Sequence, residues 1–349
     1  MRKLLPILPG LILSLSVLAA CGAPVETPAE SGPADGGPVV ADLSLYDGQN
    51  LTYIVATGPG GNYDAYGRLI GRFLQKYLTG SRVIVRNVPG AGHIVGANTL
   101  YASRPDGLTI ATFNTGLIYT QLLERQGVQF DLAQMDWIGS AAHDIRVIVL
   151  PTDSPYGSFE EYVNSGDTLR VAAAGVGSAA YNDTRIVAEA LHLNVEIIAG
   201  FEGNEGQLSM LRGEVTGLLG AAGTFTQFVN NGGGYYALAV SGDSQTVPQA
   251  RDFVTDDRGG RLLGLIEALS ELGRLTAAPP GIPANRLATL REAYRLALED
   301  PELHQEAEIL NLPIEPAFGD EVRELVLTAM DQTPDSIQLL REATDVSDQ

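Results

Sequence analysis

The sequence predicts two α/β lobes, each with a parallel-rich sheet flanked by helices. Short β-prone runs alternate with glycine turns and helical stretches between residues 51 and 113, and the same order of elements returns between 169 and 240. The length of 349 residues exceeds the usual size of one compact domain. With 45% apolar and 18% charged residues, the chain has enough apolar surface for a buried core.

In the first half, β-prone runs predict strands at 51–56, 82–86 and 108–113. The first run leads into a glycine turn, Thr57-Gly-Pro-Gly-Gly61. Apolar residues then recur every three or four positions from Tyr66 to Tyr77, which indicates a helix with one buried face. A second glycine turn, Pro89-Gly-Ala-Gly92, precedes a helix that we expect to end near Ala102.

The second half repeats this order, with strands expected at 169–174, 195–198, 215–220 and 236–240. We expect helices at 179–191, at about 203–212 and 284–298, and from Pro301 and Gly319. The first lobe would then comprise 50–150 plus 242–349, and the second 151–241. The crossings near Pro151 and Ser241 are the expected hinge strands.

The N-terminus predicts export. Two cationic residues precede an apolar run that ends at Ala20, which is typical of a signal peptide over 1–20. Cys21 follows Leu18-Ala-Ala20 as in a bacterial lipobox, so we expect lipidation of Cys21 and a lipid anchor in the membrane; an ordinary signal cleavage that leaves a free thiol is the alternative. Residues 21–49 are rich in small residues and predict a flexible tether. The expected location is the periplasm or cell envelope.

Charge and residue usage exclude several classes of protein. With 42 acidic and 22 basic residues, the net charge is −20, which argues against nucleic acid as a partner. The single Cys excludes a multi-cysteine metal site, and the four His residues have no HxxxH or HExxH spacing. We therefore expect no metal and no cofactor.

Two glycine turns are the candidate binding loops, Gly58-Pro-Gly-Gly61 and Gly175-Val-Gly-Ser178. Each precedes a predicted helix, whose first N–H groups and partial positive charge favour an anion. If the lobes face each other, both turns point into one cleft. A simple tight turn remains open for the first. The second also resembles a dinucleotide fingerprint, but Glu196 lies inside the next strand and not after it.

Three polar residues near these turns have plain interpretations. Asp64 lies in the first turn of a helix, where it either complements the helix dipole or contacts a ligand. Ser178 lacks the G-x-S-x-G pattern of a hydrolase and is interpreted as a helix-starting donor. His93 has no identifiable acid–base partner nearby, so we interpret it as a surface residue of its turn.

Three motifs occur in a specific order: Pro59-Gly-Gly-Asn-Tyr-Asp64, Asn87-Val-Pro-Gly-Ala-Gly92 and Pro105-Asp-Gly107. Together they resemble the extracytoplasmic solute receptors of tripartite tricarboxylate transporters, the Bug family. The resemblance spans about residues 50–345. It implies a type II-like periplasmic-binding-protein fold, a Venus flytrap whose two lobes close on a small carboxylated solute.

The resemblance also implies which residues contact the solute. In the first lobe these are Gly60, Gly61, Asn62, Tyr63, Asp64, Asn114 and Thr115, and in the second Gly177, Ser178, Ala179, Phe201 and Gly203. The chain departs from the family pattern at Tyr181, Thr216 and His93, where the family commonly has His, Asp and Gly. These departures indicate a divergent member with its own solute.

The expected function is therefore a receptor without catalytic residues. It would capture a small organic acid and deliver it to the membrane subunits of a tripartite tricarboxylate-type transporter, and we expect it to be a monomer. Two alternatives stay open at this point. One is an exported enzyme acting on a small organic acid, and the other is a ligand-sensing subunit of a signalling system.

Overall fold

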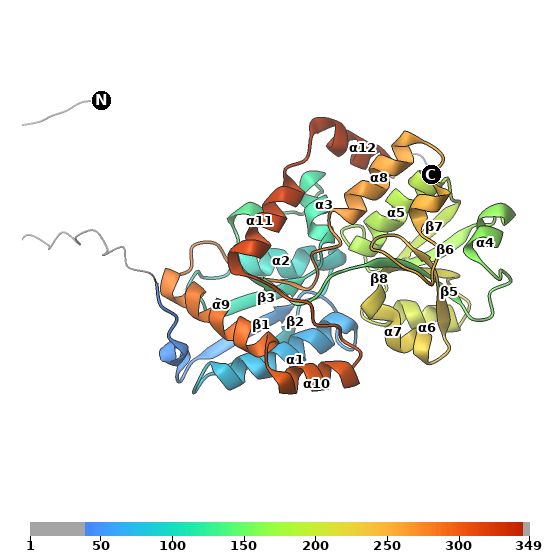
Figure 1. The fold of residues 1–349 in the computed structure, drawn as a ribbon. Helices are drawn as coiled ribbons and strands as arrows, with labels where there is room; N and C mark the ends of the chain where they lie inside the picture. Colours follow the sequence, from blue (N-terminus) through green and yellow to red (C-terminus); the bar gives the residue numbers. More distant parts are fainter. Residues whose placement is uncertain (1–38, 345–349) are drawn as a thin grey trace, which may run out of the picture. The chain divides into compact units, whose positions relative to one another are not determined.

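The computed structural model describes residues 39–344, so Cys21, the predicted signal peptide and most of the predicted tether lie outside the described residues. Two sheets flanked by helices make up this part of the chain (Figure 1), which confirms the predicted α/β fold class. None of the helices between residues 39 and 344 has the length and apolar character that crossing a membrane requires.

The first sheet has six strands in the order β11-β4-β10-β3-β1-β2. Their bounds are β1 Asn50–Val55, β2 Arg82–Asn87, β3 Thr109–Phe113, β4 Asp136–Ser140, β10 Leu275–Ala278 and β11 Ala317–Phe318. Strand β1 pairs in parallel with β2 and β3, and β10 runs antiparallel to β3 and β4. The loops that follow β1 and β3 therefore leave the sheet at the same edge, where a ligand site is expected.

The second sheet has five strands in the order β7-β6-β8-β5-β9. Their bounds are β5 Arg146–Pro151, β6 Leu169–Ala173, β7 Val195–Ala199, β8 Gly217–Ala221 and β9 Gly234–Ala239. Strand β6 is parallel to β7 and β8, and β5 runs antiparallel between β8 and β9. Because β5 is antiparallel, its first residue lies at the same edge as the last residues of β8, and Arg146 pairs with Ala221.

Helices cover both faces of each sheet. In Figure 1, α1, α9 and α10 lie on one side of β1–β3, with α2, α3 and α11 on the other; α6 and α7 lie opposite α5 and α8 on the second sheet. The bounds are α1 Asn62–Tyr77, α2 Ile94–Tyr101, α3 Gly116–Leu122, α4 Phe159–Ser165, α5 Ala179–Leu191, α6 Glu205–Leu211, α7 Ala222–Asn230, α8 Asp257–Glu267, α9 Ala284–Leu298, α10 Pro301–Ile309, α11 Gly319–Met330 and α12 Pro334–Thr344.

Helix α1 shows how the apolar pattern positions the first binding loop. Its buried face carries Leu69, Ile70, Phe73 and Leu74, as the spacing of apolar residues predicts, and packs against β1, β2 and α9. Burial of side chains of this size contributes roughly 1.5–3 kcal/mol each. The packed helix therefore holds its own N-terminus, and the glycine turn before it, at the edge of the sheet.

The structure differs from the predicted lobe boundaries in one strand. The predicted first lobe, 50–150, includes most of β5, whereas β5 belongs to the second sheet. The chain therefore leaves the first sheet at residues 141–145 and not near Pro151. The physical reason is backbone pairing. The run Arg146–Pro151 is apolar after its first residue, and it lies between β8 and β9, which provide hydrogen-bond partners on both of its edges.

The C-terminal segment also divides differently from the predicted lobes. Helices α8 and α12, which the prediction assigns to the first lobe, pack against α5 on the second sheet. Strands β4, β10 and β11 and helices α3, α4, α7, α8 and α12 were not predicted, and β5 was expected only as a hinge strand near Pro151.

Candidate binding site

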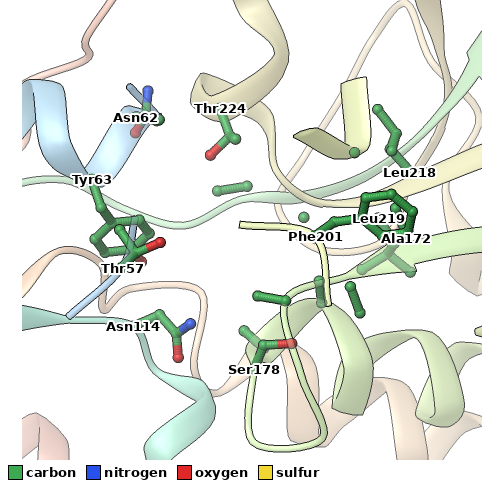
Figure 2. A pocket seen from close by; sticks show the side chains of 18 of the residues that line it. Thr57, Asn62, Tyr63, Asn114, Ala172, Ser178, Phe201, Leu218, Leu219 and Thr224 are labelled. Atoms are coloured by element: carbon green, nitrogen blue, oxygen red, sulfur yellow. The ribbon is translucent and has the colours of Figure 1, made fainter. Parts of the chain in front are cut away.

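A cavity of about 140 Å³ lies where the edges of the two sheets meet. The loops and helix starts of the first sheet contribute Thr57, Gly61, Asn62, Tyr63, His93 and Asn114. The second sheet and its helices contribute residues that include Arg146, Ala172, Ser178, Ala179, Phe201, Gly203, Leu218, Leu219, Thr224 and Phe225. Figure 2 shows Thr57, Tyr63 and Asn114 on one side and Phe201, Leu218 and Leu219 on the other.

The first glycine turn is held from behind by Asp64. Its carboxylate accepts hydrogen bonds from the backbone N–H of Gly60 (3.0 Å), from Asn87 Nδ2 (2.9 Å) and from Arg68 Nε (3.0 Å). Burial would raise the pKa of Asp64, but these hydrogen bonds together lower it. The carboxylate of Asp64 is therefore ionised, and its hydrogen bonds to protein groups position the turn. Asp64 itself does not line the cavity.

The second glycine turn ends in the N-cap of α5. Ser178 Oγ accepts from the backbone N–H of Tyr181 (3.3 Å) and donates to the carbonyl of Gly175 (2.7 Å). This pair of bonds closes the turn and starts the helix, so the predicted role of Ser178 as a helix-starting residue is confirmed. Ala179 and Ala180, the first residues of α5, line the cavity beside Ser178.

The two sides of the cavity touch one another directly. Glu202, after β7, accepts hydrogen bonds from Thr57 Oγ1 (2.9 Å) and from the backbone N–H of Gly58 (3.3 Å). Asn62 Nδ2 donates to the carbonyl of Gly223 (3.2 Å). Gly92 packs against the backbone of Ser178 so closely that a Cβ there would overlap it. The cavity is therefore closed over on several sides by contacts between the two halves.

Arg146 is the charged residue of the cavity that the sequence analysis missed. It is buried at the start of β5, where its Nε lies 3.0 Å from Asp183 Oδ2 and its Nη2 donates to Thr115 Oγ1 (2.8 Å). Asp144 lies 3.5 Å from the same Nη2 and also forms an ion pair with Arg274. The sequence did contain an indication of this role, because Arg146 is a charged residue directly before the apolar run of residues 147–150.

Burial raises the pKa of Asp183 to about 6, although Arg146 and a hydrogen bond from Tyr119 oppose the shift. The carboxyl group thus stays partly protonated near pH 6. Of the four charged groups in this cluster, Arg146 alone lines the cavity. Among the described residues that line it there is one arginine, no lysine and no carboxylate.

His93 is not a surface residue, which corrects the prediction. Only 4% of it is exposed, and its backbone has a left-handed φ of 82°. Its ring packs in a T-shaped arrangement with the Tyr63 ring, with the ring centroids 5.1 Å apart. Its Nδ1 accepts from the backbone N–H of Asn114 (3.3 Å). Burial lowers the pKa of His93 to about 3, so the ring is neutral at neutral pH. Packing of the turn against Ser178 buries the ring.

The structure brings together most of the predicted contacts. The cavity lining includes Gly61, Asn62, Tyr63, Asn114, Ser178, Ala179, Phe201 and Gly203, whereas Gly60, Asp64, Thr115 and Gly177 lie outside it. Asp64 accepts a hydrogen bond from Arg68, and Thr115 accepts one from Arg146. The carbonyl of Gly177 accepts a hydrogen bond from Thr120 Oγ1 (3.3 Å). Within residues 39–344, no three His, Cys, Asp or Glu side chains gather as a metal site would need.

Two α/β halves that meet over a cavity at their strand ends define a two-lobed binding protein. Within that class, the chain belongs to the tripartite tricarboxylate transporter receptor family, whose model matches residues 68–333. The resemblance deduced from the glycine motifs is thereby confirmed.

Curated relatives are distant. A UPF0065 protein encoded in the TAR-I ttuE-ttuC' intergenic region of Agrobacterium vitis is 25% identical over 262 residues, which cover 73% of each chain. Another UPF0065 protein, from the tcbD-tcbE intergenic region of Pseudomonas sp. strain P51, is 27% identical over 161 residues. That match spans 45% of this chain and 47% of the relative, about half its length.

Solved structures share the fold. The periplasmic binding protein BugD has a TM-score of 0.72 at 20% identity, covering 85% of this chain and 98% of BugD. MatC from Rhodopseudomonas palustris, solved with bound malate, has a TM-score of 0.68 at 19% identity, covering 83% of this chain and 98% of MatC. These likenesses support the two-lobed fold.

Proposed function

We propose that this receptor is an exported, non-enzymatic binding protein that closes on a small carboxylate and delivers it to its transporter. One observation carries the proposal: in a chain of net charge −20, the cavity is lined by one buried arginine and no carboxylate. The first residues of α1 and α5 also line it, and helix starts favour anions. The malate bound to the related MatC is in accord with this choice of ligand class.

The proposed mechanism is a shift between open and closed states. A solute that touches both halves stabilises the closed state by as much as its affinity for that state exceeds its affinity for the open one. We propose that the two sheets move as separate lobes, 50–150 with 242–349 against 151–241. Two refinements apply: the first boundary lies at residues 141–145, and helices α8 and α12 move with the second sheet. The contacts of Glu202 and Asn62 across the cavity are of the kind that such closure would form.

The experiment that tests this function is a screen of organic acids by thermal shift, followed by small-angle scattering. A bound carboxylate should raise the melting temperature by ligand stabilisation. It should also reduce the radius of gyration if the solute-free protein opens. A chemically broad panel of organic acids that leaves the melting temperature unchanged would contradict the proposal.

We further propose that lipidation of Cys21 anchors the receptor in the membrane of the cell envelope. The proposal rests on the single Cys of the chain following a signal-like apolar run and the residues Leu18-Ala-Ala20. Metabolic labelling with a fatty acid should label the wild-type chain and not the Cys21→Ser variant. The variant should also no longer be found in the membrane fraction. Labelling of the variant would contradict this assignment.

The proposed partners are the membrane subunits of the transporter, and the proposed receptor is a monomer. Co-purification of cross-linked membrane proteins separates transport from sensing: a permease subunit supports delivery, and a signalling kinase would point to a sensor instead. Light scattering of the purified chain checks the monomeric state.

A further inference from the structure

We propose that Arg146 is the counter-ion of the solute's carboxylate and that the solute is a small monocarboxylate with an apolar body. This inference rests on the proposed function, because it names the class of acid that the same cavity takes. It follows from the charge of the lining, the largely apolar composition of the second-sheet side and the size of the cavity.

Arg146 is the one member of a charge-balanced cluster that lines the cavity. Arg146 and Arg274 are balanced by Asp144 and Asp183, which lie 3.5 and 3.0 Å from Arg146 and do not line the cavity. An anion in the cavity therefore meets Arg146 before it meets either aspartate. The ion pair with Asp183 and the hydrogen bond to Thr115 also fix the guanidinium, so little side-chain entropy is lost when the anion binds.

Apart from Arg146, Ser178, Gln207 and Thr224, the second-sheet side of the cavity is apolar. Phe201, Leu218, Leu219 and the small residue Ala172 line it (Figure 2), and Phe225 completes this apolar part of the lining. A second carboxylate placed there would lose its hydration without gaining a cation, and burial of an unpaired charge is strongly unfavourable. A hydrocarbon group at the same place gains about 25 cal/mol for each Å² that it buries.

Two polar side chains of that side, Gln207 and Thr224, already take part in hydrogen bonds within the protein. Gln207 Nε2 donates to the carbonyl of Thr224 (3.0 Å), and Thr224 Oγ1 accepts from Arg274 Nη2 (3.4 Å). The cavity volume of about 140 Å³ is similar to that of an apolar protein cavity that holds benzene, roughly 150 Å³. The site therefore fits one carboxylate joined to a body of a few carbon atoms.

Calorimetric titration of the purified full chain tests this assignment. The probes are acetate, butanoate and benzoate as monocarboxylates, succinate, malate and citrate as acids with more charges, and benzamide as an uncharged analogue. The better of butanoate and benzoate should bind about tenfold or more tighter than acetate and than each polycarboxylate, because one paired charge and one apolar contact favour it.

Arg146→Gln should weaken monocarboxylate binding by about tenfold or more and leave the weak binding of benzamide unchanged. Arg82→Gln, at an exposed arginine of β2, is the matched control. If Arg146→Gln does not fold because Asp183 loses its partner, Arg146→Gln combined with Asp183→Asn removes both charges.

The outcomes separate this inference from the function on which it rests. Equal or tighter binding of succinate, malate or citrate overturns the monocarboxylate assignment and leaves the receptor function standing. Unchanged butanoate or benzoate affinity in a folded Arg146 variant overturns the role of Arg146. If no acid of either class binds, both the inference and the proposed function fail.

Discussion

The backbone of Gly61 lies directly against that of Gly203, on the opposite side of the cavity. A Cβ built at Gly61 would be 2.6 Å from Gly203 Cα, closer than real Cβ atoms approach. Gly61 has φ −92° and ψ 176°, which any residue can adopt. The glycine is therefore required by the approach of the two halves and not by the backbone conformation of the turn.

This contact predicts that Gly61→Val prevents full closure. The valine side chain would separate Gly61 from Gly203, so the stabilisation by a bound carboxylate should fall to near zero while the protein remains folded. Thermal shift with and without the acid measures the effect. Gly264→Ala is the control, because a Cβ there meets nothing within 4 Å, and it should keep the full shift. A normal ligand shift in Gly61→Val would contradict this explanation.

The hydrogen bonds of Glu202 predict a second effect on closure. Glu202→Ala removes the acceptor of Thr57 Oγ1 and of the Gly58 N–H. Loss of these charge-assisted bonds should shift the population toward the open state and weaken solute affinity by about tenfold. Titration calorimetry and small-angle scattering report the two changes. Glu196→Ala, at an exposed residue of β7, should change neither the affinity nor the scattering curve. If the two variants behave alike, the hydrogen bonds of Glu202 do not stabilise the closed state.

The buried His93 predicts a specific loss of stability in acid. Its folded pKa, about 3, lies below the ordinary value of 6.5, so the stability it contributes is complete above pH 6.5 and is lost as pH falls toward 3. The slope from this group is at most about 1.4 kcal/mol for each pH unit. His93→Asn, which tolerates a left-handed backbone, should remove that part of the slope. Denaturant unfolding of both proteins between pH 7 and 4 gives the free energy of unfolding as a function of pH. If this free energy falls equally steeply in the wild type and in His93→Asn, His93 does not cause the loss.

Asp64 is predicted to act on the first glycine turn from outside the cavity. Asp64→Ala leaves the Gly60 N–H and the Asn87 amide without their acceptor, at an expected cost of about 1–3 kcal/mol in the free energy of unfolding. Solute affinity should fall as well, because the turn loses its support. Asp243→Ala, at a side chain 93% exposed, should change neither stability nor affinity. If Asp64→Ala unfolds with the same free energy as the wild type, the first glycine turn does not depend on Asp64 for its conformation.

Much of the fold was predictable because its signals are local. Helix α5 begins after its Ser178 cap and ends at Leu191, and α9 spans Ala284–Leu298; both sets of bounds match the sequence prediction. Strand β5 was expected only as a hinge crossing near Pro151. Its place inside the second sheet was not predicted, since that place depends on backbone partners from β8 and β9, which follow it by many residues.

The sequence by itself determined the two glycine loops, the helices that start from them and the receptor family, because turn chemistry and apolar spacing act over short stretches of chain. The tertiary structure alone decided that Arg146 lines the cavity, that His93 is buried and that Asp64 supports a loop. Burial and the choice of an ion-pair partner depend on which distant segments pack together, and Arg146 meets Asp183 only after β5 and α5 have docked on one another.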